Sequence, residues 1–193
     1  MKAHMTSLIR FGLTLLIALS AGRALALGGD FTLTDSSGAP YHLSDSRGQV
    51  VILAFGYTFC PDVCPTALAT IAQAMRQLGT AADRVDPLFV TLDPDRDTPA
   101  HLQEYTRFFH PRLRGLTGDA DTLDEVARRY RVHYNFVGKG EREHYSLDHS
   151  ANVFILDTRG KLYAIVPHGL PPEVFVRRVQ AALQRAEVAD AVR

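Results

Sequence analysis

The feature that most constrains the fold is an apolar run that ends shortly before the only two cysteines of the chain. Val50 to Phe55 is apolar without alternation, which is typical of a central strand covered on both faces. Cys60 and Cys64 follow, and apolar residues then recur at helical spacing. The two thiols therefore lie where a strand passes into a helix N-terminus, where backbone dipoles favour thiolates.

The remaining sequence alternates between strand and helix patterns. Helices are predicted after Cys64, after Thr98-Pro99, after Asp119 or Asp121, and from Pro171-Pro172 onward. Strands are predicted at Phe31 to Leu33, Tyr41 to Leu43, Leu88 to Leu92, Val153 to Leu156 and Leu162 to Val166, with an exposed loop at Asn135 to His144. This order predicts an α/β, thioredoxin-like domain, in which a central mixed β-sheet is flanked by helices.

The first residues have the pattern of an export signal. Lys2 and Arg10 precede an apolar run at Phe11 to Gly22, and Ala24-Leu25-Ala26 supplies the small residues that a signal peptidase reads. The apolar run has about 12 residues, against the roughly 20 of a spanning helix. Residues 1–26 are therefore predicted to be a signal peptide, with an N-terminal anchor as the alternative, and residues 27–193 to be one exported, periplasmic domain.

Composition narrows the possible partners. The 193 residues suffice for one sizeable globular domain. The chain has 21 basic and 21 acidic side chains, so its charge favours neither nucleic acid nor an anionic membrane surface.

The cysteine pair allows few kinds of chemistry. Two thiolates serve redox exchange, a structural disulfide, or a soft metal such as Cu(I) or Zn. Residues four apart on a helical turn face the same way, and the extra residue relative to a C-x-x-C motif leaves room for a metal between the sulfurs. A disulfide here would close too short a loop to stabilise the fold much.

A third ligand is sought among the eight histidines. His149 is best placed, because Asp148-His149-Ser150 directly precedes the strand Ala151 to Leu156. In a thioredoxin-like sheet that loop lies across from the cysteine-bearing turn, and imidazole with thiolates suits copper. His144 is the reserve candidate, whereas His42, His101, His110 and His133 are interpreted as ordinary surface or helix-end residues.

Other side chains near the cysteines have two possible roles. Tyr57 and Phe59 are expected to wall the site and exclude water. Asp93 and Asp97 are interpreted as turn and capping residues, with an acidic surface for a partner's basic patch as the alternative.

Four stretches of this chain resemble the Sco/SenC family, and the similarity runs from about Phe31 to about Phe175. They are FGYTFCPDVCP (residues 55–65), TLDPDRDTP (91–99), FHP with GLTG (109–111 and 115–118), and DHS (148–150). The resemblance implies that Cys60, Cys64 and His149 bind one copper ion, as Cu(I) or Cu(II). It also implies that the cysteine pair can cycle to a disulfide. One departure is Phe59, since many members have histidine there.

The family resemblance implies an exported copper chaperone that delivers copper to the dinuclear copper centre of cytochrome c oxidase. The expected partners are the copper-bearing oxidase subunit and other copper chaperones or thiol oxidoreductases. The alternative is a thiol-disulfide reductase that maintains a partner's cysteines without carrying metal. A peroxiredoxin is a third hypothesis, because its attacking thiol lies at a similar junction.

Overall fold

The computed structural model describes residues 27–140 and 145–191. The predicted signal peptide or anchor, residues 1–26, lies outside the described residues, and so does His144. None of the helices within the described ranges has the length and apolar character needed to cross a membrane.

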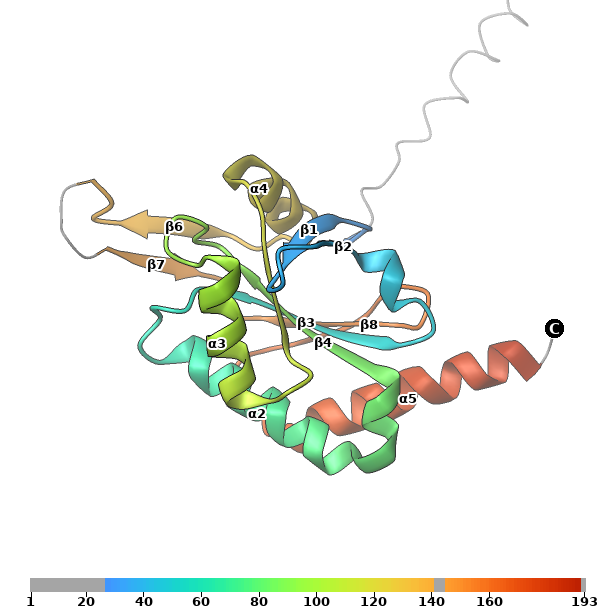
Figure 1. The fold of residues 1–193 in the computed structure, drawn as a ribbon. Helices are drawn as coiled ribbons and strands as arrows, with labels where there is room; N and C mark the ends of the chain where they lie inside the picture. Colours follow the sequence, from blue (N-terminus) through green and yellow to red (C-terminus); the bar gives the residue numbers. More distant parts are fainter. Residues whose placement is uncertain (1–26, 141–144, 192–193) are drawn as a thin grey trace, which may run out of the picture.

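The predicted strands and the four predicted helices occur in the predicted order along the chain (Figure 1). Three further strands, at Arg114–Thr117, Tyr134–Val137 and Ser146–His149, were not predicted. The strands are β1 (Thr32–Asp35), β2 (Pro40–His42), β3 (Val50–Gly56), β4 (Val85–Thr91), β5 (Arg114–Thr117), β6 (Tyr134–Val137), β7 (Ser146–His149), β8 (Val153–Leu156) and β9 (Leu162–Val166). The helices are η1 (Leu43–Ser46), α2 (Val63–Leu78), η2 (Gly79–Arg84), α3 (Pro99–Phe109), α4 (Ala120–Arg129) and α5 (Pro172–Ala191).

Seven strands form one mixed sheet in the order β2-β1-β5-β4-β3-β8-β9. β3, β4 and β5 are parallel to one another, while β8 pairs antiparallel with β3 and β9 antiparallel with β8. The parallel strands require crossover helices, which α2 and α3 supply. The predicted mixed, thioredoxin-like α/β sheet is confirmed.

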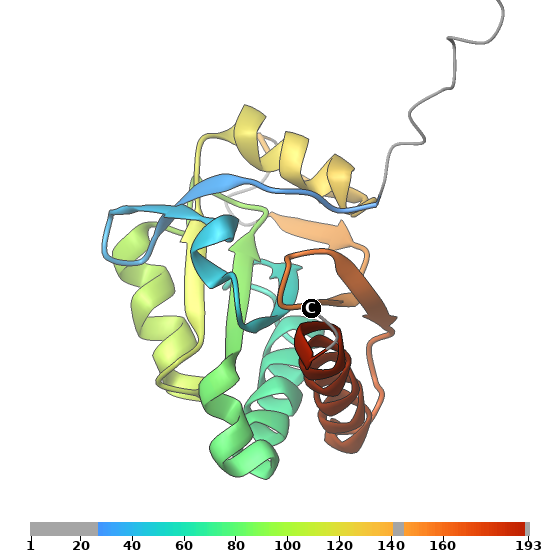
Figure 2. The same ribbon diagram turned by 90° about the vertical axis from the view of Figure 1, so that its right-hand side faces the viewer.

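Both faces of the sheet are covered, which explains why the run from Val50 to Phe55 does not alternate. Val51, Leu53 and Phe55 pack in a core with residues of α4, and the intervening residues of β3 pack in a second core with α2, α3 and α5. Figures 1 and 2 show α4 on one side of the sheet and the other three long helices on the opposite side. A strand between two cores needs apolar side chains at every position.

β6 and β7 form a separate two-stranded sheet, so the prediction of a loop at Asn135 to His144 is wrong at its beginning. Tyr134 to Val137 alternates between half-buried and exposed positions, as an edge strand does. His149 is the last residue of β7 and pairs with Tyr134, whereas the sequence placed it in a loop. The glycines and charges at 138–143 hid the short strand.

A buried carboxylate ties the first strands to the central sheet. Asp86 of β4 is nearly inaccessible and accepts hydrogen bonds from Ser46 Oγ (2.5 Å) and Tyr41 Oη (3.2 Å). Tyr41 Oη and Ser46 Oγ are also 2.6 Å apart. A buried acceptor that loses a donor costs more free energy than the bond itself contributes.

Ser46→Ala is therefore expected to lower the free energy of unfolding by about 1–3 kcal/mol, because it leaves a buried carboxylate with one donor fewer. Urea denaturation measures the change. Ser44→Ala is the matched control, since Ser44 is exposed in the same short helix and should change stability by less than about 0.5 kcal/mol. Equal effects of the two substitutions would contradict the role of Ser46.

Candidate metal centre

The two thiols lie at the carboxyl end of β3, in the turn before α2 and in the first turn of that helix. The turn is closed by a hydrogen bond from Cys60 N to the Tyr57 carbonyl (3.3 Å). Cys64 N, one of the helix N–H groups without an intrahelical acceptor, points at Cys60 Sγ (3.4 Å). The helix N-terminus thus holds both sulfurs on one side of the turn.

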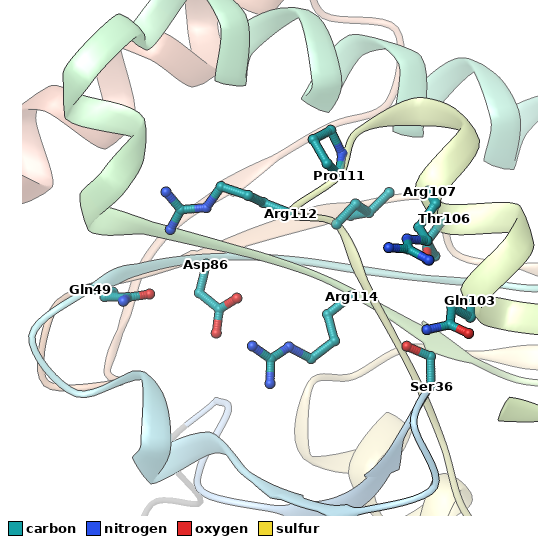
Figure 3. A pocket seen from close by; sticks show the side chains of 10 residues that line it. Ser36, Gln49, Asp86, Gln103, Thr106, Arg107, Pro111, Arg112 and Arg114 are labelled. Atoms are coloured by element: carbon teal, nitrogen blue, oxygen red, sulfur yellow. The ribbon is translucent and has the colours of Figure 1, made fainter. Parts of the chain in front are cut away.

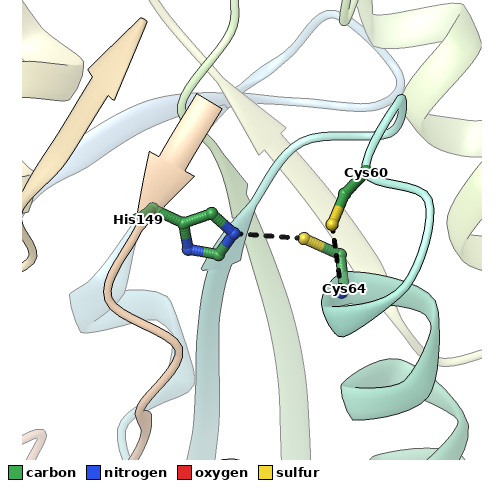
Figure 4. Close-up of side chains that lie close together, drawn as sticks. All are labelled: Cys60, Cys64 and His149. Carbon is green, nitrogen blue, oxygen red and sulfur yellow. Dashed lines mark hydrogen bonds between the residues drawn. The ribbon is translucent and has the colours of Figure 1, made fainter. Parts of the chain in front are cut away.

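His149 approaches the sulfurs from the end of β7 (Figure 4). Its Nδ1 lies 2.9 Å from the Ser150 carbonyl oxygen, which can only accept, so Nδ1 carries the proton of the neutral ring. Nε2 then presents its lone pair to Cys64 Sγ at 3.4 Å. The two sulfurs and one imidazole nitrogen all lie within 4.8 Å of one another. The structure therefore brings together the three residues that the sequence singled out.

Burial sets the protonation of this cluster. Cys64 is only 3% exposed, and burial raises the pKa of its thiol, so the expected activation by the helix dipole does not dominate there. Burial also lowers the pKa of His149, which keeps its imidazole neutral at pH 7. A neutral imidazole is ready to bind a metal, whereas Cys64 must release a proton when it does so.

The predicted walls of the site differ from each other. Tyr57 is buried, and its ring meets the His149 imidazole edge to face, with 6.1 Å between centroids. Phe59 is 55% exposed and stacks on His101 at 5.6 Å between centroids. The prediction of an apolar wall is therefore right for Tyr57 and wrong for Phe59, which leaves the Cys60 side of the cluster more open than the Cys64 side.

The alternative of an acidic surface at Asp93 and Asp97 is wrong, because both side chains are 0% exposed. Asp97 accepts hydrogen bonds from Thr58 N (3.0 Å), Thr58 Oγ1 (2.5 Å) and Thr91 Oγ1 (2.6 Å). Asp95 is exposed, and it forms an ion pair with Lys139 at 2.6 Å. The buried carboxylate of Asp97 thus anchors the cysteine turn through Thr58.

The anchoring role of Asp97 could not be read from the sequence. The run of three aspartates in the loop is visible, but burial of two of them depends on segments that meet only in the folded chain. Burial raises the pKa of Asp97.

A separate pocket of about 340 Å³ lies at the opposite ends of the central strands (Figure 3). Its polar lining includes Asp86 and three arginines, at positions 107, 112 and 114. Arg112 is paired with Asp83 at 2.9 Å, and Arg114 lies over the Tyr41 ring. None of the lining residues belongs to the cysteine–histidine cluster.

Gly56 leaves the space that the Cys64 sulfur occupies. A Cβ at this position would lie 2.6 Å from Cys64 Sγ and 2.9 Å from Phe89 Cε2. Such contacts are shorter than real Cβ atoms make, so any larger residue must displace the sulfur. The last residue of β3 is therefore part of what fixes the cluster.

Gly56→Ala in a Cys60→Ser background is expected to speed the reaction of Cys64 with a thiol reagent, because the new methyl group displaces the buried sulfur. It should also lower the free energy of unfolding by about 1–3 kcal/mol. Gly115→Ala is the control, since its Cβ would lie 2.8 Å from Leu102 Cβ, a core contact away from the thiols. If both substitutions change the rate of Cys64 modification equally, the change reflects destabilisation of the whole domain, and the specific role of Gly56 is contradicted.

Comparison with known proteins identifies the family that this chain resembles. The SCO1/SenC family model matches residues 20–184. A bovine relative, the mitochondrial SCO2 homolog, is 45% identical over 141 residues, which are 72% of this chain and 53% of the relative. The chain thus spans about half the length of the mammalian SCO2 relatives that it matches.

Two solved structures with copper bound are close in fold. Arabidopsis thaliana ScoI has a TM-score of 0.76 and 32% identity, with 83% of this chain and 99% of that chain covered. Bradyrhizobium japonicum ScoI has a TM-score of 0.75 and 36% identity, with 82% and 100% covered. Because the family model matches most of this chain, the chain belongs to the SCO1/SenC family.

Proposed function

We propose that this protein is a copper chaperone whose cargo is held by Cys60, Cys64 and His149. The observation that carries the proposal is the convergence of two sulfurs and one imidazole nitrogen within 4.8 Å. Soft thiolates favour Cu(I) and imidazole suits copper, whereas hard cations prefer oxygen ligands. The ligand-ready Nε2 of His149 and the copper-bound structures of the Arabidopsis and Bradyrhizobium relatives support copper as the cargo.

The geometry suits transfer of the metal as well as its binding. Cys64 is buried, whereas Cys60 and His149 are half-buried, and Cys60 lies beside the half-exposed Phe59. A partner's thiolate can approach a three-ligand copper from the Cys60 side and replace the protein ligands one at a time. Such ligand exchange needs no acid–base catalyst.

We further propose the dinuclear copper centre of cytochrome c oxidase as the destination, with the copper-bearing subunit as the partner. Membership of the SCO1/SenC family supports this client. The domain of residues 27–193 would act in an exported, periplasmic location, delivered there by residues 1–26 as a signal peptide or anchor. The basic residues, short apolar run and small residues of that segment support this location.

Copper competition with a Cu(I)-specific chelator tests the ligand set. Cys60→Ser, Cys64→Ser and His149→Ala should each weaken Cu(I) binding by more than the roughly 10–100-fold that loss of an outer-shell partner costs. His133→Ala is the matched control, because its side chain is exposed and outside the cluster. Wild-type affinity in any of the three ligand variants would remove that residue from the site.

Thiol-disulfide exchange is a second candidate function, favoured by the unequal exposure of the two cysteines. The Cys60 thiolate would attack a partner's disulfide, form a mixed disulfide and release one partner thiolate. Cys64 would then attack the Cys60 sulfur, form the Cys60–Cys64 disulfide and release the second partner thiolate. The partner gains two electrons and this chain loses two.

Oxidised glutathione serves as the probe for this exchange. Cys64→Ser should accumulate a glutathione adduct on Cys60, since the resolving thiol is missing. Cys60→Ser should form much less adduct, because Cys64 is buried and burial raises its pKa. Mass spectrometry measures both. Equal adduct formation on the two variants would refute the assignment of Cys60 as the attacking thiol.

A further inference from the structure

The ligands of the proposed centre come from two segments that share no strand pairing. The thiols follow β3 of the seven-stranded sheet, whereas His149 ends β7 of the separate two-stranded sheet. The chain links them closely, because β8, which pairs with β3, begins four residues after His149. Side-chain contacts between the cysteine turn and the beginning of β7 must fix the rest of their relative position. Arg96, in the loop between β4 and α3, contacts both.

Three aromatic rings surround the Arg96 guanidinium. Its central carbon lies 3.7 Å from the centroid of the Tyr145 ring, 4.7 Å from that of Phe59 and 5.6 Å from that of Tyr57. Tyr57 and Phe59 belong to the cysteine turn, and Tyr145 directly precedes β7. Distances below about 6 Å are those at which a cation is attracted to a ring face.

Hydrogen bonds fix the same guanidinium. Arg96 Nη1 donates to the Tyr145 carbonyl at 2.9 Å, and Nε donates to the Asp93 carboxylate. Tyr145 Oη donates to the other Asp93 oxygen at 2.8 Å. Asp93 is fully buried and Arg96 is 19% exposed, so the ion pair is largely shielded from water. Arg96, Asp93 and Tyr145 therefore form a closed unit.

The surroundings of the third guanidinium nitrogen, Nη2, indicate that the aromatic contacts stabilise the charge. Nη2 is buried and has no hydrogen-bond partner among the residues that the structure describes. The negative faces of aromatic rings are the groups that compensate a positive charge in such a place. A lysine keeps the charge but lacks the planar group that lies over the rings while bonding two acceptors.

We propose that Arg96 is a positioning residue for the metal centre, where it holds the cysteine turn and the beginning of β7 in the register that brings His149 to the thiols. This inference rests on the proposed copper function for its main readout. Arg96 would act on the centre through Tyr57. The guanidinium lies over the Tyr57 ring, and that ring contacts the His149 imidazole, with 6.1 Å between the two ring centroids. Arg96 itself belongs to none of the ligand groups.

The test compares Arg96→Lys with Ser46→Ala, which disturbs a buried bond elsewhere in the sheet. Arg96→Lys should weaken Cu(I) binding about 10–100-fold and change the thiolate-to-Cu(II) absorption band, as loss of outer-shell support does. Ser46→Ala should leave affinity and band as in the wild type. Wild-type affinity and absorption in Arg96→Lys, or equal changes in Ser46→Ala, would overturn the proposal.

Phe59→Leu keeps the test decisive if Arg96→Lys fails to fold. Phe59 is half-exposed, and its loss removes one ring from the guanidinium without opening the core. A smaller loss of Cu(I) affinity with the same change in the absorption band is expected. An unchanged affinity and band in this variant would overturn the proposal.

A metal-free measurement separates this inference from the proposed function. In a Cys60→Ser background, Arg96→Lys should alter the rate at which a thiol reagent modifies Cys64, and Ser46→Ala should not. A wild-type protein that fails to bind copper would refute the chaperone function alone. An unchanged Cys64 rate would refute the positioning role alone.

Discussion

The docking of the small β6–β7 sheet against the carboxyl end of β3 is the contact on which the rest of the site depends. β3 is held between two apolar cores, so its end is a fixed point in the molecule. His149 reaches the thiols because β7 is packed there, with Leu147 buried in the same core as Phe55 and Cys64, and because the next strand, β8, pairs with β3. A cluster of soft ligands thus arises between β3 and β7, which do not pair with each other and are held together by side-chain contacts and by the short link from His149 to β8.

Buried polar groups fix the position of the cysteine turn, as strand or helix hydrogen bonds fix a regular element. The Asp97 carboxylate accepts hydrogen bonds from the backbone N–H and the hydroxyl of Thr58, and the Asp93 carboxylate accepts from Arg96 and Tyr145. Buried carboxylates are costly unless they are hydrogen-bonded or paired, and here both are satisfied. Their hydrogen bonds and the Arg96 ion pair offset the cost of burying them and fix the position of the turn that carries the thiols.

The two cysteines are chemically unequal because their surroundings differ. Cys64 packs into the space left by Gly56 and lies beside His149, and burial raises its pKa. Cys60 lies next to the more exposed side of the site. This asymmetry suits stepwise release of a metal, and it also suits an exchange reaction in which one thiol attacks and the other resolves.

The fold class could be predicted from the amino-acid sequence, and Cys60, Cys64 and His149 were its first candidates for the cluster, with His144 in reserve. The unbroken apolar run before the cysteines requires two covered faces, and the helix spacing after them requires a crossover, since both patterns are local. Expectations failed where the outcome depends on distant contacts: the strand β6, the place of His149 on β7, the exposure of Phe59 and the burial of Asp93 and Asp97. These features follow from the folded arrangement, because burial of a side chain is set by the segments that pack over it. The role that Arg96 plays between two sheets belongs to the same class, since its partners Phe59 and Tyr145 are far apart along the chain.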